Sequence, residues 1–194
     1  MAKNFCILLI IISCFSCEDN YVPKPKAFLR LDYPQAKYIE SNLELPFVFE
    51  TNLLATKVGS KQVRTTAKSY GLNIEYPLLK ATLFLTYKPI EDNNGINLKN
   101  YIRDAQNFTQ KHMIKADEIP VFPYENKERK VYGQFSEVIG DVASPAQFYV
   151  TDSVNHFVTG SLYFNVKTKY DSILPSINYL EKDIRHIMET IKWK

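Results

Sequence analysis

The cysteines of this chain are confined to its N-terminus. Cys6, Cys14 and Cys17 lie in or beside an apolar segment, and residues 18–194 contain no cysteine. The remaining body, of about 170 residues, is large enough to bury one core without disulfides. Because this body contains no cysteine, it has no disulfide, no thiol nucleophile and no cysteine metal site. Its fold must depend on the packing of its apolar side chains.

The N-terminus has the layout of a bacterial lipoprotein signal. Lys3 precedes an apolar run from Phe5 to Ile12, and small residues and cysteines follow. A cationic start, a short apolar run and a small residue before the cleavage point are typical of a removed export signal. The run is also shorter than the about 20 residues that a membrane-spanning helix needs. We expect residues 1–16 to be a signal peptide.

Two cysteines compete for the lipid. Cys14 ends the tetrapeptide Ile-Ile-Ser-Cys, which matches the pattern aliphatic, aliphatic, small, cysteine and would end the signal at residue 13, whereas Cys17 has bulky Phe15 two places upstream. The neighbouring residues favour Cys14. Acyl chains would hold the protein on a membrane, because each buried methylene contributes about 0.8 kcal/mol. The alternatives are a cleaved secretory signal and a short uncleaved anchor.

Residues 17–44 are interpreted as a tether and an entering strand. Pro23 and Pro25, which follow Tyr21, favour an extended and semi-rigid conformation. This stretch is a solvated spacer or a docking strip for a partner. The formal charge of +3 includes Lys3, so the mature chain is nearly balanced and shows no basic patch for nucleic acid.

Residues 45–194 are expected to form a single α+β domain. Apolar side chains at spacings of three and four predict helices over 97–115, with Asn97 as the N-cap, and over 175–193, with Pro175 in the first turn. Residues 57–70 are expected to be a loop or weak strand, and the chain to loop through Pro123 after residue 120. Alternating patterns predict strands over residues 28–33, 45–50, 72–76, 80–88, 130–139, 146–151 and 156–167.

The order of these elements predicts a largely antiparallel sheet covered by helices. Close turns between the last three strands predict a meander, and aromatic side chains on both faces of 156–167 predict cover on both sides. The arrangement resembles a Mog1/PsbP-like sandwich. Folds of this kind carry unrelated functions, so the resemblance does not assign one.

The sequence contains no convincing active site. A nominal triad can be drawn from residues close in sequence: Asp141, Ser144, Asp152, Ser153 and His156. However, Asp152 and Ser153 lie in an expected hairpin turn, where both residue types bond the local backbone, and no G-x-S-x-G elbow surrounds Ser153. We therefore predict no catalytic residue.

Metal and phosphate sites are not indicated either. His112, His156 and His186 fall on three different elements without a metal-binding spacing, and the six glycines form no phosphate-binding motif. His112 lies on an apolar stripe and is interpreted as a core histidine, and His186 as a packing or solvent-facing one. We predict no metal, no cofactor and no small-molecule substrate.

Several segments together resemble the gliding motility lipoprotein family GldD of Bacteroidetes-type bacteria. They span essentially the whole mature chain: Tyr-Val-Pro-Lys-Pro-Lys at 21–26, Tyr-Lys-Pro at 87–89, Lys-His at 111–112, Lys-Ala-Asp at 115–117, Phe-Tyr-Val-Thr-Asp-Ser at 148–153, His-Phe at 156–157, Gly-Ser-Leu-Tyr-Phe-Asn at 160–165 and Asp-Ile-Arg-His-Ile-Met-Glu-Thr at 183–190.

This resemblance implies a non-catalytic component of the cell envelope. It would be needed for gliding and for the coupled type IX secretion machinery, would be anchored to a membrane by a lipid placed on Cys17, and would contact other machinery proteins from the periplasm or the cell surface. Whether it sits on the inner or outer membrane stays open. We expect a partner-contact patch that includes Tyr21, Pro23, Pro25, Asp152, Ser153 and His156.

Two other functions were considered. One is a periplasmic ligand-binding lipoprotein, whose pocket wall would contain Phe157, Tyr163 and Tyr149. The other is a hydrolase that uses Ser153 and His156, and it requires hydrogen-bond contact between their side chains.

Overall fold

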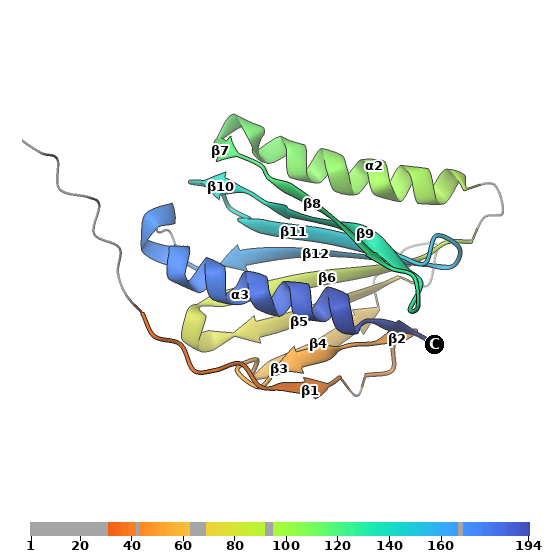
Figure 1. Ribbon diagram of the computed structural model, residues 1–194, viewed down its shortest axis with the longest axis horizontal. Coiled ribbons are helices and arrows are strands. Elements are labelled where there is room, and N and C mark those ends of the chain that lie inside the picture. The colour runs from red at the N-terminus through yellow and green to blue at the C-terminus, as the bar shows by residue number, and fades with distance from the viewer. Residues whose placement is uncertain (1–30, 42, 63–68, 92–94, 167–168) are drawn as a thin grey trace, which may run out of the picture.

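The fold is a seven-stranded antiparallel sheet with a helix on each face (Figure 1). It is seen in a computed structural model that describes residues 31–194 except 42, 63–68, 92–94 and 167–168. The predicted α+β class and the cover on both faces are confirmed. The signal peptide, Cys14, Cys17, Tyr21, Pro23 and Pro25 all lie outside the described residues.

The sheet is built from hairpins and one long excursion. Its strand order is β4-β5-β6-β12-β11-β9-β8, so β6 and β12 are neighbours although α2 and five strands lie between them in sequence. The strands are β4 (Lys57–Gln62), β5 (Tyr70–Tyr76), β6 (Ala81–Pro89), β8 (Val121–Asn126), β9 (Val131–Glu137), β11 (Ala146–Thr151) and β12 (His156–Phe164).

Smaller elements complete the fold. Three two-stranded sheets pair β1 (Tyr38–Glu40) with β3 (Glu50–Asn52), β2 (Phe47–Val48) with β13 (Lys192–Trp193), and β7 (Ala116–Glu118) with β10 (Ile139–Gly140). The helices are η1 (Pro77–Leu79), α2 (Ile96–Gln110), η2 (Lys111–Ile114) and α3 (Tyr170–Thr190). Within the described part of the chain, no helix is both long and apolar enough to cross a membrane.

The main core lies between the sheet and α3. Leu83, Leu85 and Tyr87 on β6 point into it, as the alternation predicts, and Val158 and Leu162 on β12 join them. The apolar stripe of α3 completes this core through Leu180, Ile184, Ile187 and Met188, and Ile191 joins it directly after the helix. Burial of this stripe is the main reason that α3 forms, since helix stability in proteins comes mostly from packing.

Both predicted helices have different ends in the structure. The helix α2 begins at Ile96 after Gly95, which adopts φ = 66°, so the N-cap is Gly95 and not Asn97. The helix α3 begins at Tyr170, whose N–H donates to Asp141 Oδ1 at 2.8 Å, so Pro175 lies inside the helix and not in its first turn. A distant loop thus caps α3, which the local sequence could not show.

The C-terminal end of α3 was also predicted wrongly. The helix ends at Thr190, and Lys192 and Trp193 form β13, which pairs with β2. Pairing with Phe47 and Val48 satisfies backbone groups that a longer helix would have used internally. This change of direction moves the indole of Trp193 to the end of the sheet.

Three strand predictions need correction. Residues 121–126 form the edge strand β8 and not a loop, and the edge tolerates Pro123 because the outer side of an edge strand has no partner to receive an N–H. In the predicted strand 28–33, residues 28–30 lie outside the described part, and residues 31–33 are not a strand. The predicted strand 156–167 ends at Phe164.

The N-terminal arm, residues 33–40, packs against α3. Tyr33 Oη lies 2.7 Å from Ser176 Oγ, and Tyr38 Oη donates to Asp183 Oδ1 at 2.8 Å. Asp183 is 1% exposed and also accepts from Asn52 Nδ2 on β3, at 2.8 and 3.0 Å. Burial raises the pKa of Asp183, and these hydrogen bonds oppose the rise. A buried carboxyl group therefore fastens the arm to the domain.

Candidate interaction surface

A rigid hairpin turn connects β11 to β12. Asp152 Oδ1 accepts the backbone N–H groups of Val154, Asn155 and His156 at 2.8–3.0 Å. Thr151 Oγ1 accepts the N–H of Ser153 at 2.9 Å and donates to the carbonyl of His156 at 2.6 Å. Ser153 adopts φ = 69°, which these bonds hold in place. The turn is thus fixed by its own side chains, and its tip is exposed, with Val154 at 63%.

The imidazole of His156 is held between two aromatic side chains. Its Nδ1 lies 3.0 Å from the hydroxyl of Tyr87, and its ring stacks on Trp193 with a centroid distance of 5.1 Å and an interplanar angle of 4°. Burial lowers the pKa of His156, while the charge of Asp152 opposes the change. Burial, followed by the charge of Asp152, raises the pKa of Tyr87 to about 12. Both rings are therefore neutral at pH 7.

Trp193 joins this turn to two other segments. Its Nε1 donates to the carbonyl of Lys130 in the β8–β9 turn at 3.1 Å, and its ring contacts Phe47 edge-on at 6.1 Å. Figure 1 shows the two turns and the C-terminus at the same end of the molecule. We call this surface the C-terminal corner and define it as residues 151–156 with Tyr87, Lys130 and Trp193.

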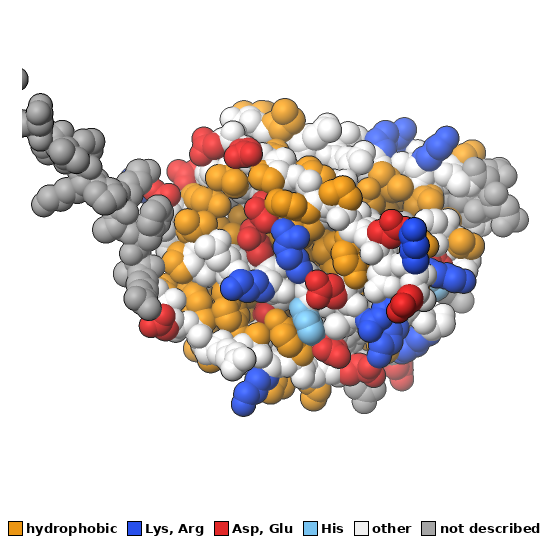
Figure 2. All heavy atoms as spheres, in the orientation of Figure 1, with side chains coloured by type: hydrophobic (Ala, Val, Ile, Leu, Met, Phe, Trp, Pro, Cys, Tyr) orange, Lys and Arg blue, Asp and Glu red, His pale blue; other side chains and the backbone are white. Residues whose placement is uncertain are grey.

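Charged side chains surround the C-terminal corner. Arg129 Nη1 donates to the carbonyl of Glu189 at 2.6 Å, which ties the β8–β9 turn to the end of α3. Lys192 Nζ lies 3.5 Å from Glu40, and Lys194 is exposed. Figure 2 shows lysine and arginine side chains mixed with acidic ones at this end. Such a mixed polar rim around an aromatic centre is typical of a surface that contacts another protein.

The structure does not assemble the nominal triad. Asp141 and Ser144 precede β11, whereas Asp152, Ser153 and His156 follow it, so the two groups lie at opposite ends of the strand. The Nδ1 of His156 faces the Tyr87 hydroxyl, and Asp152 Oδ1 accepts hydrogen bonds from backbone N–H groups of the turn. A base needs a nucleophile within reach and a group that orients it. The arrangement at His156 instead serves packing.

The three histidines stay on separate elements. His112 contacts Phe108 edge-on at the end of α2. His186 Nε2 lies 2.7 Å from Glu50 Oε2, and its ring stacks on Tyr38 at 3.6 Å. Among the described residues, no group of three potential ligands is suited to hold a metal ion.

The aromatic wall expected for a ligand pocket is divided between two places. Tyr149 stacks on Phe157 at 5.6 Å, and Tyr101 of α2 covers Phe157, which is 1% exposed. Tyr163 lies apart from them and packs against Phe84. These three predicted residues thus do not form one wall.

Comparison with known families decides which of the expected identities applies. The family model described as gliding motility lipoprotein GldD matches residues 18–193. The chain belongs to the GldD family. Membership of the GldD family gives the protein a role in gliding motility and a place in the cell envelope as a lipoprotein. The curated proteins and the solved structures gave no match.

The surface contains members that the sequence alone did not suggest. Asp152, Ser153 and His156 lie in one turn, and Tyr87, Lys130 and Trp193 were not expected beside them. Trp193 is the one tryptophan of this GldD-family chain. This tryptophan was the one feature of the sequence that could have indicated the surface, because tryptophan is enriched at protein interfaces.

Proposed function

We propose that this protein is a non-catalytic, lipid-anchored component that holds part of the gliding machinery and of the associated type IX secretion machinery through its C-terminal corner. The observation that carries the proposal is the match to the GldD family together with a rigid exposed turn packed on Trp193. A turn fixed by its own hydrogen bonds loses little freedom when a partner covers it.

The anchor is proposed to be on Cys17. The family match begins at residue 18, directly after this cysteine, which supports Cys17 over Cys14. In this proposal residues 1–16 are the signal peptide, residues 17–44 the tether and residues 45–194 the domain, which faces the periplasm or the cell surface. The described chain begins at the end of the molecule opposite the C-terminal corner (Figure 1). The corner is therefore free to face a partner.

The test uses a gene deletion complemented with variants. Val154→Asp places a charge at the exposed tip of the corner, and we expect spreading on agar and secretion to be lost while the protein accumulates normally. Leu78→Asp is the matched control, since Leu78 is 78% exposed in η1, near the start of β6, whereas the corner lies beside the end of β6. This control should behave as wild type.

The anchor is tested in the same strain. Cys17→Ala and the double variant with Cys14→Ala should both fail, whereas Cys14→Ala alone should restore spreading. Normal spreading and secretion in the deletion would refute the machinery role. Normal behaviour of Val154→Asp would refute the assignment of the corner, and normal behaviour of Cys17→Ala would refute the site of lipid attachment.

A further inference from the structure

The sheet face under α2 has a polar interior beside the edge of the sheet. Ser136 on β9 and Gln147 on β11 are 2% and 4% exposed, and the register places them opposite each other. A sheet face covered by a helix normally buries apolar side chains. The polar side chains of this face therefore need partners, and not all of them have one.

Gln147 is the side chain with an unpaired group. Its Oε1 lies 2.6 Å from Thr109 Oγ1 of α2, but its Nε2 is buried and has no hydrogen-bond partner among the described residues. The single hydroxyl proton of Thr109 also has the carbonyl of Ala105 within reach, at 3.2 Å. If the amide of Gln147 is rotated by 180°, Nε2 can donate to Thr109 Oγ1, and the Thr109 hydroxyl can donate to the carbonyl of Ala105. In that orientation Oε1 is unpaired in place of Nε2. Either orientation leaves one buried polar atom without a partner, which destabilises the fold.

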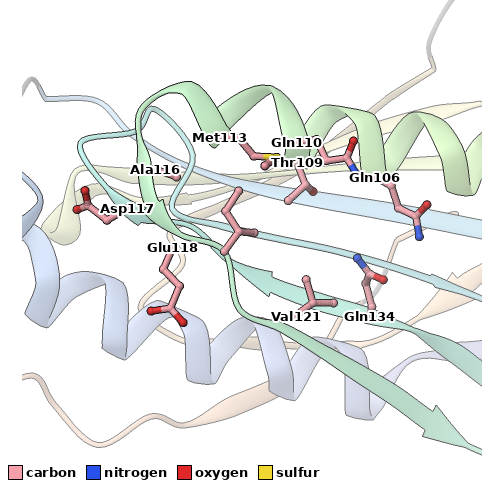
Figure 3. A pocket seen from close by; sticks show the side chains of 10 residues that line it. Gln106, Thr109, Gln110, Met113, Ala116, Asp117, Glu118, Val121 and Gln134 are labelled. Atoms are coloured by element: carbon pink, nitrogen blue, oxygen red, sulfur yellow. The ribbon is translucent and has the colours of Figure 1, made fainter.

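The residue that carries the unpaired amide lines a small void beside a larger pocket. The void, of about 20 Å³, is lined by Gln147, Thr109 and Gln134, among others, and it has room for a group of about the size of one water molecule. A pocket of about 560 Å³ shares Thr109 and Gln134 with it. Figure 3 shows Gln106 extending from α2 toward the sheet and Gln134 extending from β9 toward the helix. The floor of the pocket thus offers amide and hydroxyl groups.

The walls of the pocket define what it can accept. Met113 of η2 and Val121, the first residue of the edge strand β8, border it and are 64% and 48% exposed. Asp117 and Glu118 are also exposed lining residues, and in the described part of the chain no lysine, arginine or histidine lines the pocket. A ligand with an acidic group would therefore be repelled, and one with a basic group favoured.

Apolar surface continues beyond the pocket. Ile114 next to Met113 is 90% exposed. Phe122 does not belong to this surface, because it points to the opposite face of the sheet and packs against Phe135 and Arg185. Apolar side chains that extend past a pocket indicate that the occupant is larger than a small molecule. The pocket also opens beside β8, the edge of the sheet, where an extended peptide can lie alongside a strand.

We propose that this pocket binds an extended, uncharged or basic peptide segment of a partner protein, with a Ser or Thr hydroxyl inserted beside Gln147. A hydroxyl group both donates and accepts, so it pairs with either orientation of the buried amide. This site is separate from the C-terminal corner, because η2 and β7 lie at the other end of the molecule (Figure 1). It does not depend on the proposed role of that corner.

The test begins with random nine-residue peptides displayed on phage, selected on the full-length protein in detergent. The affinity of selected synthetic peptides is then measured by fluorescence anisotropy. Gln147→Met keeps the volume of the side chain but removes the amide, so we expect binding to weaken at least tenfold. Its melting temperature should be unchanged or higher, because an unpaired buried polar group is lost.

A control on the same sheet face is available. Phe84 is 41% exposed and does not line the pocket, so Phe84→Ser should bind the peptides as wild type does. Val121→Asp, at the rim, should weaken the binding of apolar peptides without disturbing the core.

Three results would overturn the proposal. They are a failure to select any peptide, equal peptide affinity in wild type and Gln147→Met, and selected peptides that are mainly acidic. If Gln147→Met lowers the melting temperature, the amide has a structural role and Val121→Asp becomes the deciding variant. Normal peptide binding by Val121→Asp would then overturn the proposal.

Discussion

The carboxyl group of Asp183 should contribute strongly to stability, and Asp183→Ala removes it. The variant loses the hydrogen bonds from Tyr38 Oη and Asn52 Nδ2, both at 2.8 Å. Two such bonds contribute about 2–3 kcal/mol, and the buried Asn52 amide, 2% exposed, loses an acceptor at a further cost of about 1 kcal/mol. Release of the cost of burying a carboxylate offsets part of this, so we expect a loss of about 3 kcal/mol.

The measurement is guanidinium unfolding followed by circular dichroism and by the fluorescence of Trp193, the one tryptophan of the chain. In a domain of this size, about 3 kcal/mol corresponds to a melting temperature lowered by roughly 6–12 °C. Asp183→Asn keeps the volume and one acceptor, so it should lose less than the alanine variant does.

Lys182 provides the control, because it is the exposed neighbour of Asp183 on α3. Lys182→Ala should change stability by less than about 0.5 kcal/mol. A loss below about 1 kcal/mol for Asp183→Ala, or an equal loss for the control, would refute the reasoning that the carboxyl group fastens the N-terminal arm.

Two further predictions concern pH and packing. Burial, followed by the charge of Glu137, raises the pKa of Glu181 from 4.5 to about 7 against the opposing Arg185. The native state therefore binds the proton more tightly than the unfolded chain does, so stability should fall as pH rises from 4.5 to 7. The full shift corresponds to about 3 kcal/mol, and the partial exposure of Glu181 to solvent reduces the expected fall to about 1–2 kcal/mol. Glu181→Gln should flatten this dependence in urea unfolding at several pH values, and an unchanged slope would contradict the assignment. A Cβ on Gly133 would overlap the carbonyl oxygen of Tyr149, so Gly133→Ala should lower the stability measured by thermal unfolding by about 3 kcal/mol or more. Gly59 has open space around it, so Gly59→Ala should be nearly neutral. Equal effects of the two substitutions would exclude the clash.

The sequence by itself determined the fold class and most of the strands. Alternation over Leu83, Leu85 and Tyr87 predicted the buried face of β6, and the stripe from Leu180 to Ile191 predicted the face of α3 that covers it. Such periodicities are local properties of the chain, so they can be read without knowing its partners. The family and the turn at Asp152 were likewise recognisable from the residues.

Only the tertiary structure decided where the elements end and what meets at each surface. Asp141 caps α3 from a distant loop, and pairing of β13 with β2 stops that helix at Thr190. The contact between His156 and Trp193 and the unpaired amide of Gln147 depend on residues far apart in sequence. Neither could be predicted, because a hydrogen bond or ring contact between distant residues leaves no periodicity in the chain.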